Sequence, residues 1–297
     1  MTTENNDILY HYCSPEAFLN IIQSSSIWLS DILKSNDSKE ESWIREQIHE
    51  EVVDTLKINT EASHAWETWS TRDTKHCITM YVLCLSEAKD DLSQWRGYAK
   101  DGQGFAIGFS KTYLEKLVCP YSCSFGKVIY DLHEQQKFIK KIADENLRKM
   151  QYKGVGHCVM ELNSNYMLQF PFYKNPSFVQ EKEWRIVFLA YPFYPYQEIG
   201  REMSKKNRTA VQDVKSLKPK LFGPKFRACD SQIISYIEMN FSDIKKDFIK
   251  EIWIGPKSKT TPDDILNLLQ ATGYYDDGSE ISIQKPITIS RSFSTYR

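Results

Sequence analysis

Two glutamates in the middle of the chain have the residue types and the spacing for chemistry at a sugar carbon. Glu181 and Glu183 lie in the string 180–185, which we predict to be a strand. Residues two apart in a strand project from the same face, so both carboxylates would stand side by side. One can stabilise positive charge on a sugar ring while the other deprotonates an acceptor, as paired carboxylates do in glycoside hydrolysis. The alternative is a solvated strand face on which Arg185 pairs with a glutamate at little energetic gain.

A histidine between two tyrosines, Tyr10-His11-Tyr12, occupies the first predicted strand. The ring nitrogens of His11 can hydrogen-bond a ribose hydroxyl, and the ring of Tyr12 can stack on nicotinamide. The alternative is a histidine whose hydrogen bonds serve the fold.

The string Gln94-Trp95-Arg96-Gly97-Tyr98 falls in a loop that we predict over residues 86–104. Arg96 offers the bidentate fork that suits phosphate, and Gln94 and Tyr98 are candidate neighbours in a ligand wall. Gly102 and Gly104 would let the backbone approach a ligand closely. The string matches no known phosphate-binding glycine pattern. A structural loop closed by Trp95 is the alternative.

A basic stretch follows in the second half of the chain. Residues 201–227 hold nine Lys or Arg against two acids, a local net charge of +7, with Phe222 and Phe226 interleaved. Basic charge with aromatic side chains is typical of a path for RNA or single-stranded DNA. The alternative is a solvated loop that balances acids elsewhere.

Composition excludes several other classes of site. The seven cysteines form no CxxC pair and fit no zinc spacing, so we expect reduced thiols. Asp37, Asp90 and Asp91 match no metal site, and we predict none. The net charge of −1 gives no global attraction to nucleic acid. With no signal peptide and no apolar run of about 20 residues, we expect a cytoplasmic protein that does not bind membranes.

The elements that must position these residues follow from hydrophobic periodicity and capping signals. Ser14 predicts a helix start before Pro15, and Thr261 another before Pro262. Longer helices are predicted around 44–56 and 132–152, and strands at 8–12, 27–32, 79–85, 105–109, 184–189, 251–254 and 281–289. We therefore expect one α+β domain over 1–297, with a mixed or antiparallel sheet, flanking helices and a basic insertion around 195–230.

Several strings, taken in order, resemble a widespread bacterial family classed only as a domain of unknown function. They cover nearly the whole chain and are Leu9-Tyr10-His11-Tyr12, Leu29-Ser30-Asp31-Ile32, Asn36-Asp37, Ser93-Gln94-Trp95-Arg96-Gly97-Tyr98-Ala99, Glu183-Trp184-Arg185 and Ile254-Gly255-Pro256.

The layout is also similar to the ADP-ribosyltransferase superfamily, including DarT-like toxins that modify nucleic acid. This resemblance implies a split sheet that binds NAD as substrate, with His11 as the first-strand NAD residue and Ser86 as the middle-strand serine. It implies Glu183 as the catalytic glutamate and Glu181 as the first glutamate of an ExE pair. We add Tyr12, Gln94, Arg96 and Tyr98 as NAD contacts, with Arg96 on the pyrophosphate.

On this interpretation the chain is an ADP-ribosyltransferase, a toxin or phage-defence effector that modifies RNA or single-stranded DNA and is held in check by an antitoxin or inhibitor protein. Two alternatives remain. One is an NAD glycohydrolase with water as acceptor, and the other is a non-catalytic module that binds nucleic acid through its basic stretch.

Overall fold

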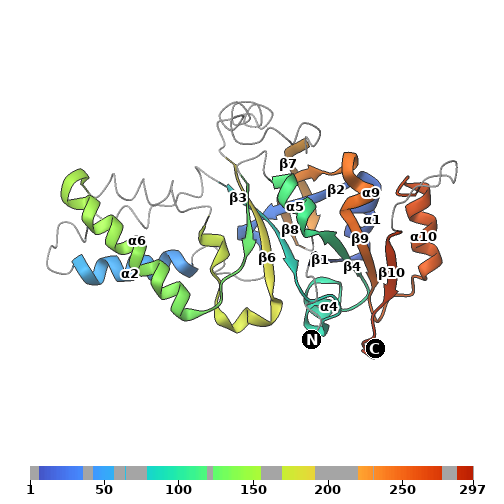
Figure 1. Ribbon diagram of the computed structural model, residues 1–297, viewed down its shortest axis with the longest axis horizontal. Helices are drawn as coiled ribbons and strands as arrows, with labels where there is room; N and C mark the ends of the chain where they lie inside the picture. Colours follow the sequence, from blue (N-terminus) through green and yellow to red (C-terminus); the bar gives the residue numbers. More distant parts are fainter. Residues whose placement is uncertain are drawn as a thin grey trace.

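The computed structural model describes residues 7–35, 43–56, 64, 79–118, 123–154, 169–190, 220–229, 231–275 and 286–296. These residues form a mixed α+β structure (Figure 1). Its strands are β1 (Ile8–Cys13), β2 (Ser26–Asp31), β3 (Thr79–Ser86), β4 (Phe105–Ser110), β5 (Cys123–Lys127), β6 (Glu183–Ala190), β7 (Lys220–Cys229), β8 (Gln232–Asn240), β9 (Ile249–Ile254) and β10 (Thr288–Arg291). Its α-helices are α1 (Pro15–Ser24), α2 (Trp43–Leu56), α4 (Leu92–Tyr98), α5 (Lys111–Val118), α6 (Leu132–Lys153), α9 (Lys245–Phe248) and α10 (Pro262–Ala271).

The strands join in one sheet of mixed direction. Its order is β10-β9-β4-β1-β3-β2-β8-β7, and β6 adds to β3 and carries β5. Strands β9 and β10 run parallel, whereas the other pairs among the described strands are antiparallel. The expected α+β class with a mixed sheet is therefore confirmed.

The sheet opens at one edge of β3. Strand β6 covers one edge of β3 along its whole length, from Thr79 to Ser86. The other edge pairs with β2 at Tyr81 and Val82, and with β1 at Ser86 alone. Residues 83–85 therefore lie between two strands that diverge from each other. We call this opening the fork.

Helices α1, α5, α9 and α10 pack against the main core of the sheet. Two of their starts follow the predicted capping signals. The Ser14 hydroxyl accepts a hydrogen bond from the Ala17 backbone N–H at 3.2 Å, ahead of Pro15. Thr261 and Asp264 form a reciprocal capping box at the start of α10. These local capping signals therefore determine where two of the helices that pack against the sheet begin.

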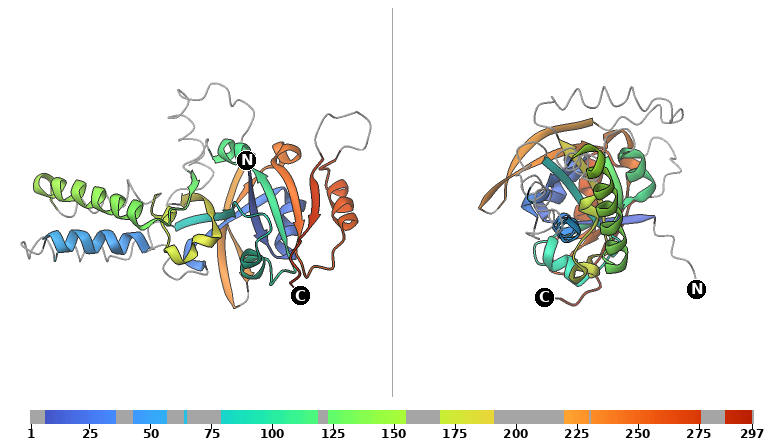
Figure 2. Two further views of the ribbon diagram at one scale, coloured as in Figure 1. Left: turned by 60° about the horizontal axis from the view of Figure 1, so that its bottom comes forward. Right: turned by 90° about the vertical axis from the view of Figure 1, so that its left-hand side faces the viewer.

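Helices α2 and α6 lie side by side and project away from the sheet as an arm (Figure 2). Ile44, Ile48 and Val52, at the predicted four-residue spacing, are buried against Ile139 and Ile142 of α6. The arm has its own small core, separate from that of the sheet.

Two local predictions were wrong. The predicted loop over residues 86–104 contains helix α4, because the Asp91 carboxylate caps its start by accepting the backbone N–H groups of Ser93 and Gln94. The predicted strand over 180–185 begins only at Glu183. Glu181 instead ends a 3₁₀ helix, Pro176–Glu181, which starts behind an Asn175 cap.

Other predictions fall partly outside the described residues. The turn at Asn36-Asp37 and residues 195–219 of the expected basic insertion lie there, as does most of the predicted strand over 281–289. Residues 220–229 of the expected basic insertion form β7, at the edge of the sheet. Within the described residues, no helix has the length and hydropathy needed to cross a membrane.

Candidate functional site

A pocket of about 240 Å³ lies at the fork. Strands β1, β2 and β3 supply three of its walls, and α4, the segment 174–183 and the β7–β8 hairpin supply the rest. Most of its lining area is carbon, with charged side chains at intervals, as is usual for a small-molecule site. The volume suits part of a nucleotide, so a larger ligand would extend beyond it.

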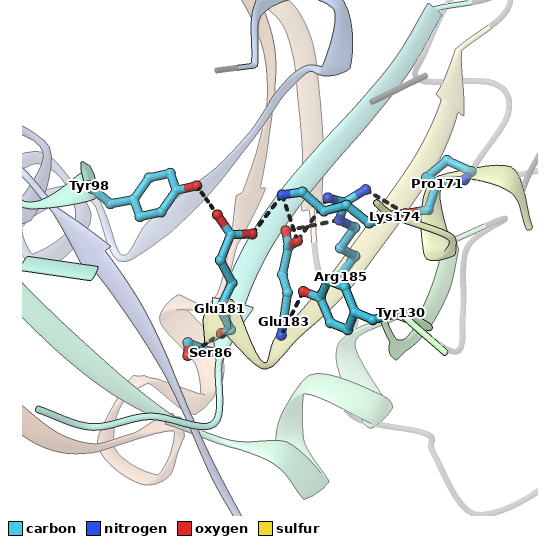
Figure 3. A network of polar contacts seen from close by, with 8 residues as sticks. All are labelled: Ser86, Tyr98, Tyr130, Pro171, Lys174, Glu181, Glu183 and Arg185. Carbon is cyan, nitrogen blue, oxygen red and sulfur yellow. Dashed lines mark hydrogen bonds and ion pairs between the residues drawn. The ribbon is translucent and has the colours of Figure 1, made fainter. Parts of the chain in front are cut away.

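One end of the pocket, which we call the carboxylate end, brings the two predicted glutamates together around a lysine (Figure 3). The Lys174 ammonium lies 2.6 Å from Glu181 Oε2 and 3.3 Å from Glu183 Oε2. On the far side of Glu181, the Tyr98 hydroxyl donates to Oε1 at 2.6 Å. Lys174 is 4% exposed, so this ammonium is held almost wholly by protein groups.

Glu183 is the more tightly held of the two carboxylates. Arg185, which is fully buried, donates from Nε to Oε1 at 2.9 Å and from Nη2 to Oε2 at 2.8 Å. Burial raises the pKa of Glu183, but Arg185 and then Lys174 outweigh it and bring the pKa down to about 2. The two carboxylates and two cations balance, so the carboxylate end is neutral as a group.

A turn, rather than a shared strand face, makes the two glutamates converge. Lys182 adopts a left-handed conformation with φ of 46°, which reverses the chain between Glu181 and Glu183. Ser86 secures this turn: its hydroxyl donates to the Glu181 carbonyl at 2.7 Å and accepts the Ala88 N–H at 3.1 Å. Ser86 therefore supports the site from behind and does not line the pocket.

The side chain of His11, on β1, lies at the edge of β3 where residues 83–85 have no partner on that side among the described strands. Its Nδ1 lies 3.0 Å from the Cys84 carbonyl, which can only accept, so Nδ1 carries the hydrogen. Burial lowers the pKa of His11, the bond to Cys84 opposes that shift, and Arg227 lowers the pKa further. The neutral ring then offers Nε2 as a hydrogen-bond acceptor.

Three further predicted residues line the same pocket in different ways. The Tyr12 hydroxyl donates to the Ala88 carbonyl and accepts the Asp91 N–H, so Tyr12 contributes its ring alone. Gln94 is buried and lines the pocket from α4, where the Asp91 carboxylate accepts its backbone N–H at 3.2 Å. Tyr98 reaches the carboxylates from α4, as described above.

Arg96 is the predicted site residue that the structure places elsewhere. It is exposed on α4, with its guanidinium 5.7 Å from the centre of the Tyr296 ring, and it does not line the pocket. The cations that do line the pocket are Lys34, Lys174 and Arg227. The basic stretch pointed to Arg227, whereas no sequence signal singled out Lys174.

A second end of the pocket, which we call the donor end, is formed by Trp28, Ser30 and Arg227. The Arg227 guanidinium lies 5.4 Å from the centre of the Trp28 ring and donates from Nη2 to the Ser30 hydroxyl at 3.1 Å. Among the described residues, Trp28 Nε1 and Arg227 Nε are the buried side-chain nitrogens that have no hydrogen-bond partner. Such a donor costs about 1–3 kcal/mol when left unpaired.

The glycines of the Trp95 region serve the chain itself. A Cβ at Gly104 would lie 2.0 Å from the Cys13 carbonyl oxygen, and one at Gly255 would lie 2.4 Å from that of Gly102. The Gly255 N–H donates to the Gly104 carbonyl across this contact at 2.9 Å. These glycines allow two backbone segments to cross, where the sequence had suggested approach to a ligand.

Two of the three aspartates considered as metal ligands, Asp90 and Asp91, are engaged in hydrogen bonds, whereas Asp37 lies outside the described residues. Asp90 accepts from the Trp95 indole at 2.7 Å and from the Ser292 hydroxyl at 2.6 Å, and Asp91 caps α4. Within the described residues, no group of three or more His, Cys, Asp or Glu could hold a metal ion.

Comparison with known proteins gives one match. Residues 94–186 match the model of a family described as a protein of unknown function, DUF2971. The matched segment runs from Gln94 on α4 to Ile186 on β6, and it contains Tyr98, Lys174, Glu181 and Glu183. No curated protein and no solved structure matches the chain.

Proposed function

We propose that this protein is an NAD-dependent ADP-ribosyltransferase with an ADP-ribosyltransferase-like sheet, a toxin or defence effector that modifies RNA or single-stranded DNA. The observation that supports it is the convergence of His11, Glu181 and Glu183 on one pocket at the fork. His11 lies about 170 positions before the two glutamates in the sequence. A pocket with a neutral histidine and two carboxylates suits a sugar with a good leaving group.

In the proposed reaction, the bond between the anomeric carbon of the ribose and the nicotinamide nitrogen breaks. Nicotinamide leaves with the bonding electron pair, and the anomeric carbon forms a new bond to an acceptor oxygen or nitrogen. Glu183 accepts a hydrogen bond from a ribose hydroxyl through Oε2, where Lys174 makes its longer contact of 3.3 Å. Glu181 takes the proton that the acceptor loses. His11 accepts a second sugar hydroxyl at Nε2.

Lys174 and Tyr98 fit this scheme as positioning residues. Both hold Glu181 at 2.6 Å, one on each carboxylate oxygen. For Glu181 to receive a proton, one of these contacts must give way to the acceptor. Tyr98 is the more accessible of the two, since its side chain belongs to the exposed face of α4.

Nucleic acid is proposed as the acceptor because of the basic stretch. Its described part ends in Lys225 and Arg227 on β7, and Arg227 lines the pocket. A cationic strand at the mouth of the site would attract a polyanion toward the reacting carbon. An antitoxin or inhibitor protein that blocks this path remains part of the proposal.

The decisive experiment incubates the purified chain with NAD labelled on the adenylate, together with cellular RNA, DNA and protein. Wild type should release nicotinamide and transfer label to nucleic acid. Glu181→Gln and His11→Asn should reduce labelling by at least about 100-fold, in the range that general-base loss produces. Glu134→Gln, an exposed glutamate on α6, is the matched control and should label normally.

The same assay separates the alternatives. Free ADP-ribose without labelled macromolecule would identify an NAD glycohydrolase. Salt-dependent nucleic-acid binding without NAD consumption would identify a binding module. If wild type consumes no NAD and labels nothing, the proposal is wrong.

A further inference from the structure

We propose that Trp28, Ser30 and Arg227 form a phosphate subsite at the donor end of the pocket. Trp28 and Ser30 lie two residues apart on β2 and so share a face, while Ile27 and Leu29 are buried in the main core. Arg227 reaches the same place from β7, across the intervening strand β8. The three side chains thus come from β2 and β7, with β8 between them in the same sheet.

The two unpaired N–H groups are the main reason for this assignment. Trp28 Nε1 and Arg227 Nε are both buried, both belong to pocket-lining residues, and neither has a partner within the described chain. Indole Nε1 and guanidinium Nε can donate a hydrogen bond but cannot accept one, so the missing partner must be an acceptor. Native proteins rarely leave buried donors unpaired, and a ligand is one established reason for an exception.

Charge narrows the class of acceptor. Arg227 carries a cationic guanidinium, and Lys34 lines the same pocket. The nearby carboxylate, Asp31, already accepts the Leu33 N–H at 3.0 Å. A fixed guanidinium beside an indole N–H and a serine hydroxyl suits an oxyanion with several acceptor oxygens. A phosphate group meets this requirement.

His11 links this subsite to the carboxylates. Arg227 acts electrostatically on His11, and His11 donates to Cys84. The Cys84 side chain in turn helps to lower the pKa of Glu183. A ligand in this pocket therefore meets cationic donors first, then a neutral histidine, then carboxylates. Under the proposed function, on which the identity of the whole ligand rests, this order places the phosphates at Arg227 and the reacting sugar at Glu183.

The phosphate could belong to a dinucleotide or to a nucleic-acid backbone. The test measures binding of ADP, adenosine and a single-stranded oligonucleotide to the full chain by calorimetry. We expect ADP to bind at least about tenfold more tightly than adenosine. Trp28→Phe, which keeps an aromatic ring beside Tyr236, should weaken ADP about fivefold, and Arg227→Gln more than tenfold. Arg148→Gln, a charge change on the exposed face of α6, should leave ADP binding unchanged.

The binding results for the Trp28 and Arg227 variants test the subsite and identify its ligand. Loss of ADP binding in the Trp28 and Arg227 variants supports the subsite and assigns it to a nucleotide ligand. The same loss for the oligonucleotide alone supports the subsite and assigns it to a nucleic-acid backbone. Binding of both ADP and the oligonucleotide that is unchanged in the two variants overturns the subsite. Because NAD turnover is measured separately, ADP binding without turnover rejects the enzyme proposal and leaves the subsite intact. NAD turnover that is unchanged in both variants supports the enzyme proposal and rejects the subsite.

Discussion

The two ends of the pocket differ in whether their buried polar groups have hydrogen-bond partners. At the carboxylate end, Glu181, Glu183, Lys174 and Arg185 neutralise one another, and the carboxylate oxygens are all hydrogen-bonded. At the donor end, two buried N–H groups have no partner among the residues that the structure describes. The first arrangement is completed by folding alone. The second lacks an acceptor among the described residues, and under the phosphate proposal a ligand supplies it.

The largest effect should come from breaking the internal neutrality of the carboxylate end. Arg185→Leu leaves Glu183 buried beside Lys174 alone, at the longer distance of 3.3 Å. Removing one partner of a buried pair costs about 3–5 kcal/mol of unfolding free energy. Urea denaturation followed by circular dichroism measures this loss. Lys137→Leu, in the exposed pair with Glu134, is the control and should cost less than about 1 kcal/mol. A loss as small for Arg185→Leu would contradict the account.

A smaller effect should follow acidification. The pKa of Glu183 is about 2 in the folded chain and about 4.3 in an unfolded one. The unfolded chain therefore binds the proton first, so the stabilisation is complete above about pH 5 and is lost as the pH falls toward 2. Urea denaturation between pH 6 and pH 2.5 should show this decline. Glu183→Gln should flatten it, and an equally steep decline in that variant would place the cause in other acids.

Two tryptophans provide a matched comparison of a paired and an unpaired indole. Trp95 is fully buried and donates to Asp90 at 2.7 Å, whereas Trp28 Nε1 has no partner within the described residues. Trp95→Phe should therefore lower the unfolding free energy by about 1–2 kcal/mol more than Trp28→Phe does. Thermal and urea unfolding of the two variants without ligand measures the difference. Equal losses would mean that the Trp28 N–H is satisfied in solution.

The smallest effect should come from the rim of the carboxylate end. Tyr98→Phe removes the hydroxyl that donates to Glu181, but Tyr98 is 38% exposed and water can take its place. The unfolding free energy should change by less than about 1 kcal/mol. A loss above 2 kcal/mol would show that Tyr98 is part of the neutral cluster and does not merely border it.

Local signals in the sequence predicted much of the fold. The Ser14 and Thr261 caps and the spacing of Ile44, Ile48 and Val52 are short-range features, and each corresponds to the element it predicted. The short helix α4 was missed because its cap, Asp91, precedes a string rich in glycine and aromatics. Strand β8 was missed as well, although its burial alternates in part along the sheet.

The candidate site was harder to predict, because its geometry depends on long-range pairing. Glu181 and Glu183 were expected to lie together because they would share a strand face. They do lie together, but a left-handed turn at Lys182 is the cause. Lys174 carried no signal at all, since nothing in its local sequence shows that it will be buried between two carboxylates. Arg96 and Arg227 both follow an aromatic side chain, and only the pairing of β7 with β8 decides which one reaches the pocket.

The long-range contacts around the fork also determine when the pocket can form during protein synthesis. Arg227 and Ser30 meet across 197 positions of sequence, and Tyr10 and Glu251 meet across 241. Strands β1, β2 and β3 leave the ribosome long before β7, β8 and β9 are available to pair with them. A nascent chain that has reached β6 already carries both glutamates and His11 but has no guanidinium opposite Trp28. The binding site is therefore completed late in translation, when the last third of the polypeptide folds back onto the first.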